Sequence, residues 1–234
     1  MARRPRIAPG GYIYHVFNRT AGRMKMFSRE KDFQAFETLI AEAQERHPMR
    51  ILSYCLMGTH WHFVVRPKRD GELTSFFRWL SHTHAMRWRV AHRTVGYGHL
   101  YQGRFKSFPV QSEGASLRAV CRYVERNALS AGLVERAQDW RWGSLWVRRQ
   151  GTVEQRGILS EWPKPVPANW IERVNTPINA RERERMKVSL ERCRPFGEDD
   201  WVVRTAGKLG MEHTMRREGR PVKTVKNVDK GKRK

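Results

Sequence analysis

The sequence predicts an α+β fold in which an antiparallel sheet has helices packed on one face. Three observations lead to this prediction. The predicted elements run strand, helix, strand, strand, helix, strand, helix along the chain. The two middle strands are separated only by Gly58-Thr59, which suits a hairpin. The last strand contains Pro109, which belongs at a sheet edge rather than in a central strand.

The strands are predicted from their composition. Residues 10–19, GGYIYHVFNR, are rich in aromatic and β-branched side chains, as strands are. Residues 49–57, MRILSYCLM, and residues 60–67, HWHFVVRP, are two apolar runs that should pair with each other. Residues 103–112, GRFKSFPVQS, form the edge segment that contains the proline.

The helices are predicted from apolar periodicity. In residues 28–46, Ser28 is the expected N-cap, and Phe33, Phe36 and Leu39 recur at helical spacing. Residues 72–92 form a second helix and residues 116–132 a third, with Gly132 at its end.

The chain is predicted to hold one main domain and an appendage. Residues 1–160 contain all the elements above and form the main domain. Residues 161–213 are a linker and short-helix extension, which begins with the proline-rich stretch EWPKPVPANW. Residues 214–234 are a basic tail that we expect to be disordered.

The charge balance points to a polyanionic partner. The 234 residues include 46 Lys and Arg against 23 Asp and Glu, a net charge of +23. Nucleic acid fits this excess best, because no long basic amphipathic helix suits a membrane surface. No apolar run approaches the roughly 20 residues of a membrane span, and we expect no signal peptide. The three scattered cysteines fit a reducing, cytoplasmic and nucleoid-associated location.

Two histidines stand out in the second strand of the predicted hairpin. Side chains two apart in a strand share a face, so His60 and His62 project together and offer two nitrogen ligands to a divalent metal. On spacing alone, a pair of hydrogen-bonded surface histidines is the better explanation, because most such pairs in strands are incidental. His82 and His84 lie on a helix, where this spacing separates them, so we interpret both as structural or solvated.

The third helix supplies a tyrosine and an asparagine one turn apart. Tyr123 and Asn127 lie beside the apolar stripe of this helix; taken alone, Tyr123 would cover the sheet and Asn127 would fray the helix end. With the histidines, the Asn oxygen would instead complete a metal site of neutral ligands, and the Tyr hydroxyl would attack a phosphodiester. The sequence shows no dedicated base; Arg122 and Arg126 are neighbouring cations that would help the tyrosine and contact DNA.

Several long motifs resemble one family. The stretches RRPRIAPGGYIYHVFNR, LMGTHWHFVVRP, GHLYQGRFKSFPV and CRYVERNALSAGLVERAQDWRW are similar to the HUH single-tyrosine transposases, most closely the REP-associated tyrosine transposases. The resemblance implies a ferredoxin-like core and single-stranded DNA hairpins from repetitive extragenic palindromes as substrates. It also implies His60, His62 and Asn127 as ligands of Mg²⁺ or Mn²⁺, and Tyr123 as the nucleophile that becomes joined to a 5′ phosphate.

The chain departs from the family pattern at three positions. Thr59 stands where an Asn is common before the first histidine, and Ala128 and Ser130 replace the usual Pro and Arg after Asn127. The expected ligands are intact. The departures concern the end of the helix and remove any DNA contact that the usual Arg would make.

Further DNA contacts are predicted where basic and aromatic residues alternate. Arg19, Arg104 and Lys106 lie in such segments, which suit single strands, although the aromatics would also fit the core with the charges solvated. Arg220 lies in REGRPVK, which resembles an AT-hook; a basic tail with only nonspecific phosphate affinity is the alternative.

The sequence therefore favours a metal-dependent single-stranded DNA endonuclease and transposase, acting as a monomer or homodimer. The alternative is a non-catalytic hairpin DNA- or RNA-binding regulator on the same fold. A replication or relaxase-type HUH nuclease is a third candidate, but such enzymes tend to have a Lys four residues after the Tyr or a second nucleophilic Tyr, and this chain has Asn127.

Overall fold

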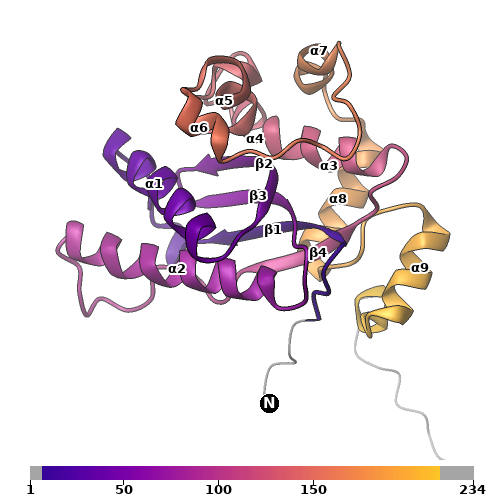
Figure 1. Cartoon of the computed structure of the whole chain (residues 1–234), viewed down its shortest axis with the longest axis horizontal. Helices are drawn as coiled ribbons and strands as arrows, with labels where there is room; N and C mark the ends of the chain where they lie inside the picture. The colour runs from indigo at the N-terminus through magenta and orange to yellow at the C-terminus, as the bar shows by residue number, and fades with distance from the viewer. Residues whose placement is uncertain (1–6, 217–234) are drawn as a thin grey trace, which may run out of the picture.

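The computed structural model describes residues 7–216 of the chain. Its centre is a four-stranded antiparallel sheet with the strand order β2-β3-β1-β4 (Figure 1). The strands are β1 (Ile13–Arg19), β2 (Arg50–Met57), β3 (His60–Arg66) and β4 (Lys106–Val110). The chain order β1-α1-β2-β3-α2-β4 and this strand order give the expected ferredoxin-like topology. Pro109 lies in the edge strand β4, as predicted.

The predicted hairpin turns at Gly58-Thr59. Met57 of β2 faces His60 of β3 across the turn, so β3 begins with the first histidine. The backbone N–H and the hydroxyl of Thr20 donate to the Thr59 carbonyl oxygen at 2.9 and 3.2 Å. The end of β1 therefore fixes the turn from which the histidines project.

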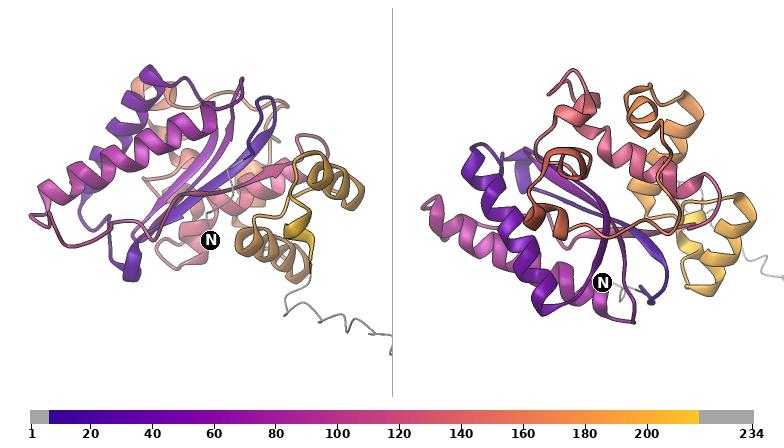
Figure 2. Two further views of the ribbon diagram at one scale, coloured as in Figure 1. Left: turned by 90° about the horizontal axis from the view of Figure 1, so that it is seen from below. Right: turned by 45° about the horizontal axis from the view of Figure 1, so that its top comes forward.

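Two helices cover the first face of the sheet. They are α1 (Glu30–Arg46) and α2 (Glu72–Ala91) (Figure 2). Trp61, Phe63 and Val65 of β3 point into the core that these helices close, and each is fully buried. The face of β3 opposite the histidines is thus filled with apolar side chains, as the alternation predicts.

The α+β class is confirmed, but helices cover both faces of the sheet rather than one. The second face carries α3 (Ser116–Glu125) and α4 (Asn127–Ser130). Val120, Cys121 and Val124 of α3 are completely buried in a second core that includes Val64 of β3. The physical reason is that the strands have apolar residues on both faces, so each face needs its own cover.

Two helix ends differ from the sequence prediction. The first helix is capped by Asp32, whose carboxylate accepts the backbone N–H groups of Ser28 and Arg29 at 3.0 and 2.9 Å, so Ser28 precedes the helix rather than capping it. The third predicted helix is divided at Arg126 into α3 and α4.

The C-terminal half adds short helices and covers parts of both sheet edges. These helices are α5 (Ser144–Gln150), α6 (Val153–Gly157), α7 (Trp170–Asn175), α8 (Ala180–Arg192) and α9 (Asp199–Lys208), with 3₁₀ turns at Ala137–Asp139 and Glu212–Met215. A further 3₁₀ turn, Ala21–Arg23, follows β1. Phe196 pairs with β4: its N–H donates to Pro109 O and its carbonyl accepts from Gln111 N, both at 2.9 Å. At the other edge, Leu56 N donates to Trp142 O at 2.9 Å.

The extension beyond residue 160 shares the second core with α3. Trp170, Val174 and Met186 are buried in the same cluster as Val120. The predicted helical extension is therefore packed on the sheet domain. Within residues 7–216, no helix combines the length and apolarity needed to cross a membrane.

Candidate active site

The two predicted histidines lie side by side on the face of β3 that is turned toward α3. Their ring centroids are 5.0 Å apart and the rings are nearly perpendicular. His62 is buried, whereas His60 at the start of the strand is partly exposed. The pair thus has a buried member and a member open to solvent.

One nitrogen of each imidazole is already engaged. His60 Nδ1 lies 3.1 Å from Thr59 Oγ1, and His62 Nδ1 lies 3.0 Å from His15 Nε2 on β1. Nε2 is therefore the nitrogen left for a ligand in each ring, and the Asn127 side chain also interacts with the His60 ring. Thr59, which departs from the family pattern, supplies a partner that orients His60.

Both histidines are neutral near pH 7. Burial lowers the pKa of His60, an effect that the hydrogen bond with Asn127 opposes and the charge of Arg19 reinforces. Burial, together with His15 and His60, lowers the pKa of His62 well below its usual value. Neutral imidazoles have a free nitrogen lone pair, as a metal ligand requires.

Tyr123 on α3 and Asn127 at the start of α4 meet the histidines. The ring of Tyr123 lies edge-on to His62, with centroids 5.8 Å apart. The Asn127 side chain lies beside both His60 and Tyr123 and interacts with each. The structure thus brings together all four residues to which the sequence prediction gave catalytic or metal-binding roles.

The phenol of Tyr123 is not activated by its protein surroundings. Burial raises its pKa, and the hydrogen bond with Asn127 only partly offsets this. Tyr123 is therefore protonated at neutral pH, and its use as a nucleophile would require further positive charge close to its oxygen.

The donor set fits a divalent cation. Residues 7–216 contain no group of three His, Cys, Asp or Glu side chains suited to a metal. The candidate site instead offers three neutral donors, which are two imidazoles and one amide side chain. The Nδ1 atoms of both imidazoles are already engaged. His60, His62 and Asn127 would hold the ion, with water or phosphate oxygens filling its other positions.

A large open groove leads to the histidines. Its volume is about 1490 Å³, and its lining includes His60, His62, Arg19, Arg104 and Lys106. The three basic side chains are exposed. The predicted DNA contacts of β1 and β4 therefore share a groove with the histidine pair.

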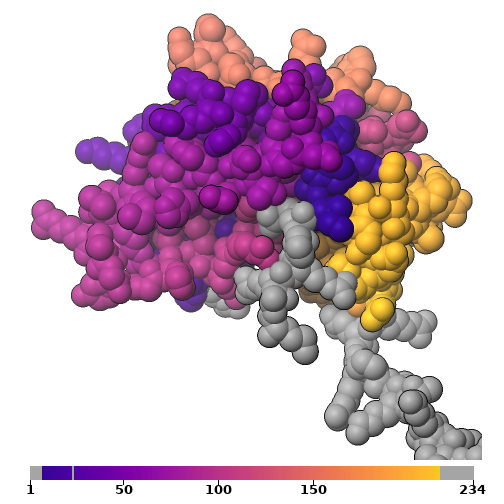
Figure 3. All heavy atoms as spheres, turned by 60° about the horizontal axis from the view of Figure 1, so that its bottom comes forward, coloured from indigo at the N-terminus to yellow at the C-terminus, as the bar shows by residue number. Residues whose placement is uncertain are grey.

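The opposite side of this groove comes from the C-terminal extension. Its lining includes Leu190, Glu191, Leu209 and Met211. In Figure 3 the yellow C-terminal part lies against the indigo β1 region, and Lys208 Nζ lies 5.9 Å from the centre of the Tyr12 ring. The extension therefore helps to shape the groove.

Arg122 and Arg126 have structural partners instead of facing the histidines. Arg122 donates to the carbonyl oxygens of Thr176 and Pro177 at 2.7 and 2.9 Å. Arg126 donates to Val174 O at 2.8 Å. Both side chains tie the tyrosine-bearing helix to α7 and the turn after it. Arg220 lies outside the described residues.

Sequence reasoning missed His15. Its side chain is completely buried, stacks on His62 at 5.0 Å and lies 6.1 Å from Tyr123 by ring centroids. The available signal was a histidine inside an otherwise apolar strand, on the same face as Phe17. Its significance depended on the pairing of β1 with β3, which the strand sequence alone does not specify.

Glu125 is a second residue that the sequence did not single out. It lies on α3 and is 3% exposed. Its carboxylate accepts hydrogen bonds from Ser144 Oγ at 2.6 Å and from Trp170 Nε1 at 2.7 Å. Glu125 thus joins α3 to α5 and α7, two residues away from Tyr123.

Comparisons with known proteins identify the family and support the fold. The family described as IS200-like transposases matches residues 10–127. A structure described as a REP-associated tyrosine transposase bound to a REP hairpin aligns with a TM-score of 0.51 and 17% identity, over 65% of this chain and 88% of that one. A candidate transposase from Deinococcus radiodurans R1 aligns with a TM-score of 0.38 and 14% identity, over 47% and 87% of the two chains. No curated protein matches the sequence.

The family match contains the whole assembled site. Residues 10–127 begin before His15 and end at Asn127, so they include both strands and the helix that carry the catalytic candidates. The resemblance to the hairpin-bound structure supports the fold. This chain belongs to the family of IS200-like transposases.

Proposed function

We propose that this protein nicks and rejoins single-stranded DNA that carries hairpins, through a covalent intermediate at Tyr123. The observation that carries the proposal is the meeting of four side chains: the Tyr123 ring lies 5.8 Å from His62 by ring centroids, and the Asn127 side chain interacts with both His60 and Tyr123. A single amide thus connects the proposed metal ligands with the proposed nucleophile. Membership of the transposase family supports DNA as the substrate.

The proposed reaction exchanges one ester bond for another. The Oη atom of Tyr123 attacks phosphorus and forms an O–P bond while the bond from phosphorus to the 3′ oxygen breaks. The phenolic proton passes to solvent, and the leaving 3′ oxygen takes up a proton. A 3′ hydroxyl later attacks the phosphotyrosine, which restores a phosphodiester and frees Tyr123 without a nucleotide cofactor.

The chain's own residues position the reactants in this proposal. His60, His62 and Asn127 would hold Mg²⁺ or Mn²⁺, which would supply Lewis-acid polarisation of the phosphate. Asn127 also orients the Tyr123 hydroxyl. Arg19, Arg104 and Lys106 pair with phosphates of the strand in the groove.

The hairpin is the proposed substrate feature for two reasons. The similar solved structure is described as bound to a REP hairpin. The groove with its basic side chains is open rather than closed around a small molecule, as a polymeric substrate requires.

The decisive experiment looks for the covalent intermediate. The protein is incubated with 3′-end-labelled single-stranded DNA that carries a short palindromic hairpin, with Mn²⁺, and then denatured. We expect the label to remain on the protein, and we expect Tyr123→Phe to lose the adduct while binding the same DNA. His60→Ala/His62→Ala should also lose the adduct, with binding within a few fold of the wild type.

Two outcomes would contradict the proposal. An adduct that persists in Tyr123→Phe would identify another nucleophile. Tyr101 is a poor substitute because it is buried and hydrogen-bonded to Trp61 and His84, so the exposed Tyr97 would be tested next. Hairpin binding without any cleavage by the wild type would favour the alternative, a non-catalytic regulator.

A further inference from the structure

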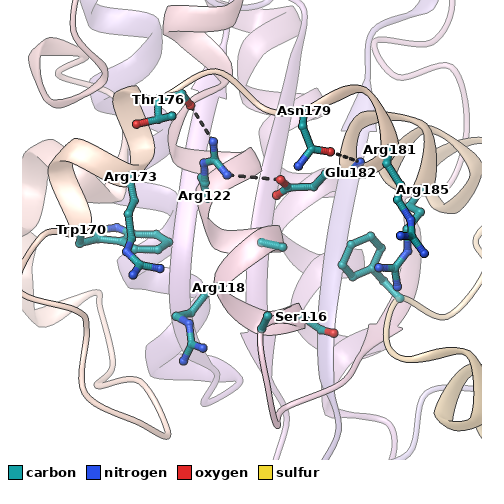
Figure 4. A pocket seen from close by; sticks show the side chains of 13 residues that line it. Ser116, Arg118, Arg122, Trp170, Arg173, Thr176, Asn179, Arg181, Glu182 and Arg185 are labelled. Carbon is teal, nitrogen blue, oxygen red and sulfur yellow. Dashed lines mark hydrogen bonds and ion pairs between the residues drawn. The ribbon is translucent and has the colours of Figure 1, made fainter.

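A second cavity lies on the outer side of α3, away from the groove of the histidines. Its volume is about 590 Å³, and α3, α7 and α8 contribute to its lining (Figure 4). Five arginines line it: Arg118, Arg122, Arg173, Arg181 and Arg185. Glu182 is the one acidic residue in its lining. We call this cavity the arginine pocket.

Three of the arginines already have internal partners. Arg122 pairs with Glu182 at 3.3 Å, and Arg185 donates to the carbonyl oxygen of Gly197. Arg173 Nε donates to Asn169 Oδ1 at 2.8 Å on its own helix. These contacts hold the walls of the pocket in place and neutralise its single carboxylate.

Arg118 and Arg181 remain without an ion pair or hydrogen bond from their side chains within residues 7–216. Arg118 comes from the first turn of α3 and Arg181 from the first turn of α8. Gathering cations around a cavity is unfavourable unless an anion binds among them. The first turn of α3 also lacks both an acidic residue and a side-chain cap, so its N–H groups add to the positive potential.

We propose that the arginine pocket binds phosphates of a nucleic-acid backbone at a second site, separate from the groove of the histidines. The two cavities lie on different sides of the C-terminal part of α8: Arg185 faces the pocket, whereas Leu190 and Glu191 line the groove. A strand that passes α8 would therefore contact both. The proposal rests on the nucleic-acid partner of the proposed function, but it does not require cleavage.

The pocket suits backbone phosphates better than base recognition. Guanidinium groups bind phosphate oxygens through paired N–H donors, and such contacts do not depend on sequence. The Trp170 ring that lines the pocket is 6% exposed and its N–H is bonded to Glu125, so little aromatic surface is open for a base. The pocket therefore raises the affinity for the strand and guides its path, but it does not select a base sequence.

The test measures affinity for a labelled 30-nucleotide oligo(dT) as a function of salt, in the Tyr123→Phe background. Phosphate contacts are sequence-independent, so the homopolymer is a valid probe. For Arg118→Ala/Arg181→Ala we expect roughly tenfold weaker binding. The slope of log affinity against log salt concentration should be smaller in magnitude by about 1.4, about 0.7 for each lost contact. Arg118→Lys/Arg181→Lys should retain most of the slope because it keeps both charges.

The matched control removes two arginines elsewhere. Arg78 on α2 and Arg149 on α5 are exposed and have no side-chain ion pair or hydrogen bond within the described residues. The variant Arg78→Ala/Arg149→Ala has the same net charge as the pocket variant. An equal fall in slope for both variants would overturn the proposal, because net charge alone would explain it.

Free phosphates in solution are the other ligands that carry the same chemical group. Pyrophosphate and dTMP are titrated by calorimetry against the wild type and the pocket variant. Binding of either that disappears in the pocket variant, with the oligo(dT) slope unchanged, would assign the pocket to free phosphates and overturn the backbone site. Absence of nicking by the protein that retains Tyr123, together with the expected smaller oligo(dT) slope of the pocket variant, would contradict the proposed function and leave the pocket proposal standing.

Discussion

His15 Nε2 lies 3.0 Å from His62 Nδ1, and the two rings stack with an interplanar angle of 11°. The other nitrogen of His15 is buried and has no hydrogen-bond partner within residues 7–216. For His62 to present an unprotonated Nε2, its Nδ1–H must donate to His15 Nε2. His15 is then a positioning residue that fixes the tautomer of His62.

We predict that His15→Phe weakens Mn²⁺ binding by roughly tenfold, the loss typical when the partner of a ligating histidine is removed. Phenylalanine fills the buried site but cannot accept the Nδ1–H of His62. Free Mn²⁺ is followed by electron paramagnetic resonance in a titration without DNA. His82→Phe is the control, since His82 is exposed on α2. Unchanged affinity in a folded His15→Phe protein would remove His15 from the site.

Glu125 should be more important for stability than its position on a helix suggests. Glu125→Ala would leave Trp170 Nε1 and Ser144 Oγ without their buried acceptor. We expect the free energy of unfolding to fall by about 3 kcal/mol. Glu125→Gln keeps an acceptor oxygen, and because burial raises the pKa of Glu125, removing its charge is tolerated. Urea unfolding of both variants checks the prediction; equal losses would contradict it.

Asp32 should make stability depend on pH. Burial alone would raise its pKa, but the backbone N–H groups of Arg29 and Ser28 and the nearby His92 outweigh burial, so the pKa lies below the ordinary value. Its contribution is therefore complete above the unfolded-state pKa near 3.8 and is lost as the pH falls through the lower folded-state pKa.

We therefore expect Asp32→Asn to lower the free energy of unfolding by about 1 kcal/mol at pH 7, as the loss of a helix cap does. The loss should become smaller as the pH falls below about 4. Urea midpoints at pH 7, 5 and 3.5 measure the difference. Glu30→Gln, an exposed carboxylate in the same first turn, is the matched control. A difference between Asp32→Asn and wild type that stays constant down to pH 3.5 would contradict this assignment.

Gly197 should be the glycine of the extension at which an added side chain lowers stability. A Cβ atom there would lie 2.5 Å from Trp201 Cε3 and 2.8 Å from Gln111 Oε1. We expect Gly197→Ala to lower the free energy of unfolding by about 2 kcal/mol, as overpacking does. Gly207→Ala on α9 meets no atom within 4 Å and should be neutral or slightly stabilising. Thermal unfolding distinguishes them, and equal melting temperatures would refute the packing argument.

Much of the fold and of the site follows from local sequence. The alternation in HWHFVVRP correctly separates the histidine face of β3 from its apolar face, and helical spacing correctly places Val120, Cys121 and Val124 in the core. Both patterns are local, because strand and helix periodicity depend only on neighbouring residues. The convergence of Tyr123 with the histidines depended on the family resemblance as well.

The features of the site that the sequence did not predict depend on contacts between segments that are distant along the chain. The role of His15 requires the register between β1 and β3, in which Phe17 faces His62. The partners of Arg122 come from the turn after α7, more than 50 residues later in the chain. A charged residue next to a catalytic candidate looks like a substrate contact in sequence, yet here it ties two helices together.

The backbone bridges at the two outer strands have a consequence for self-association. An exposed strand edge invites pairing with the edge of another molecule and so promotes aggregation. Here Phe196 occupies backbone groups of β4, and Trp142 occupies one of β2. A dimer of this protein would therefore form through side-chain surfaces rather than by extending the sheet at these positions. Fragments that end before Phe196 would reopen the β4 edge, and we expect them to precipitate even where the sheet itself still folds.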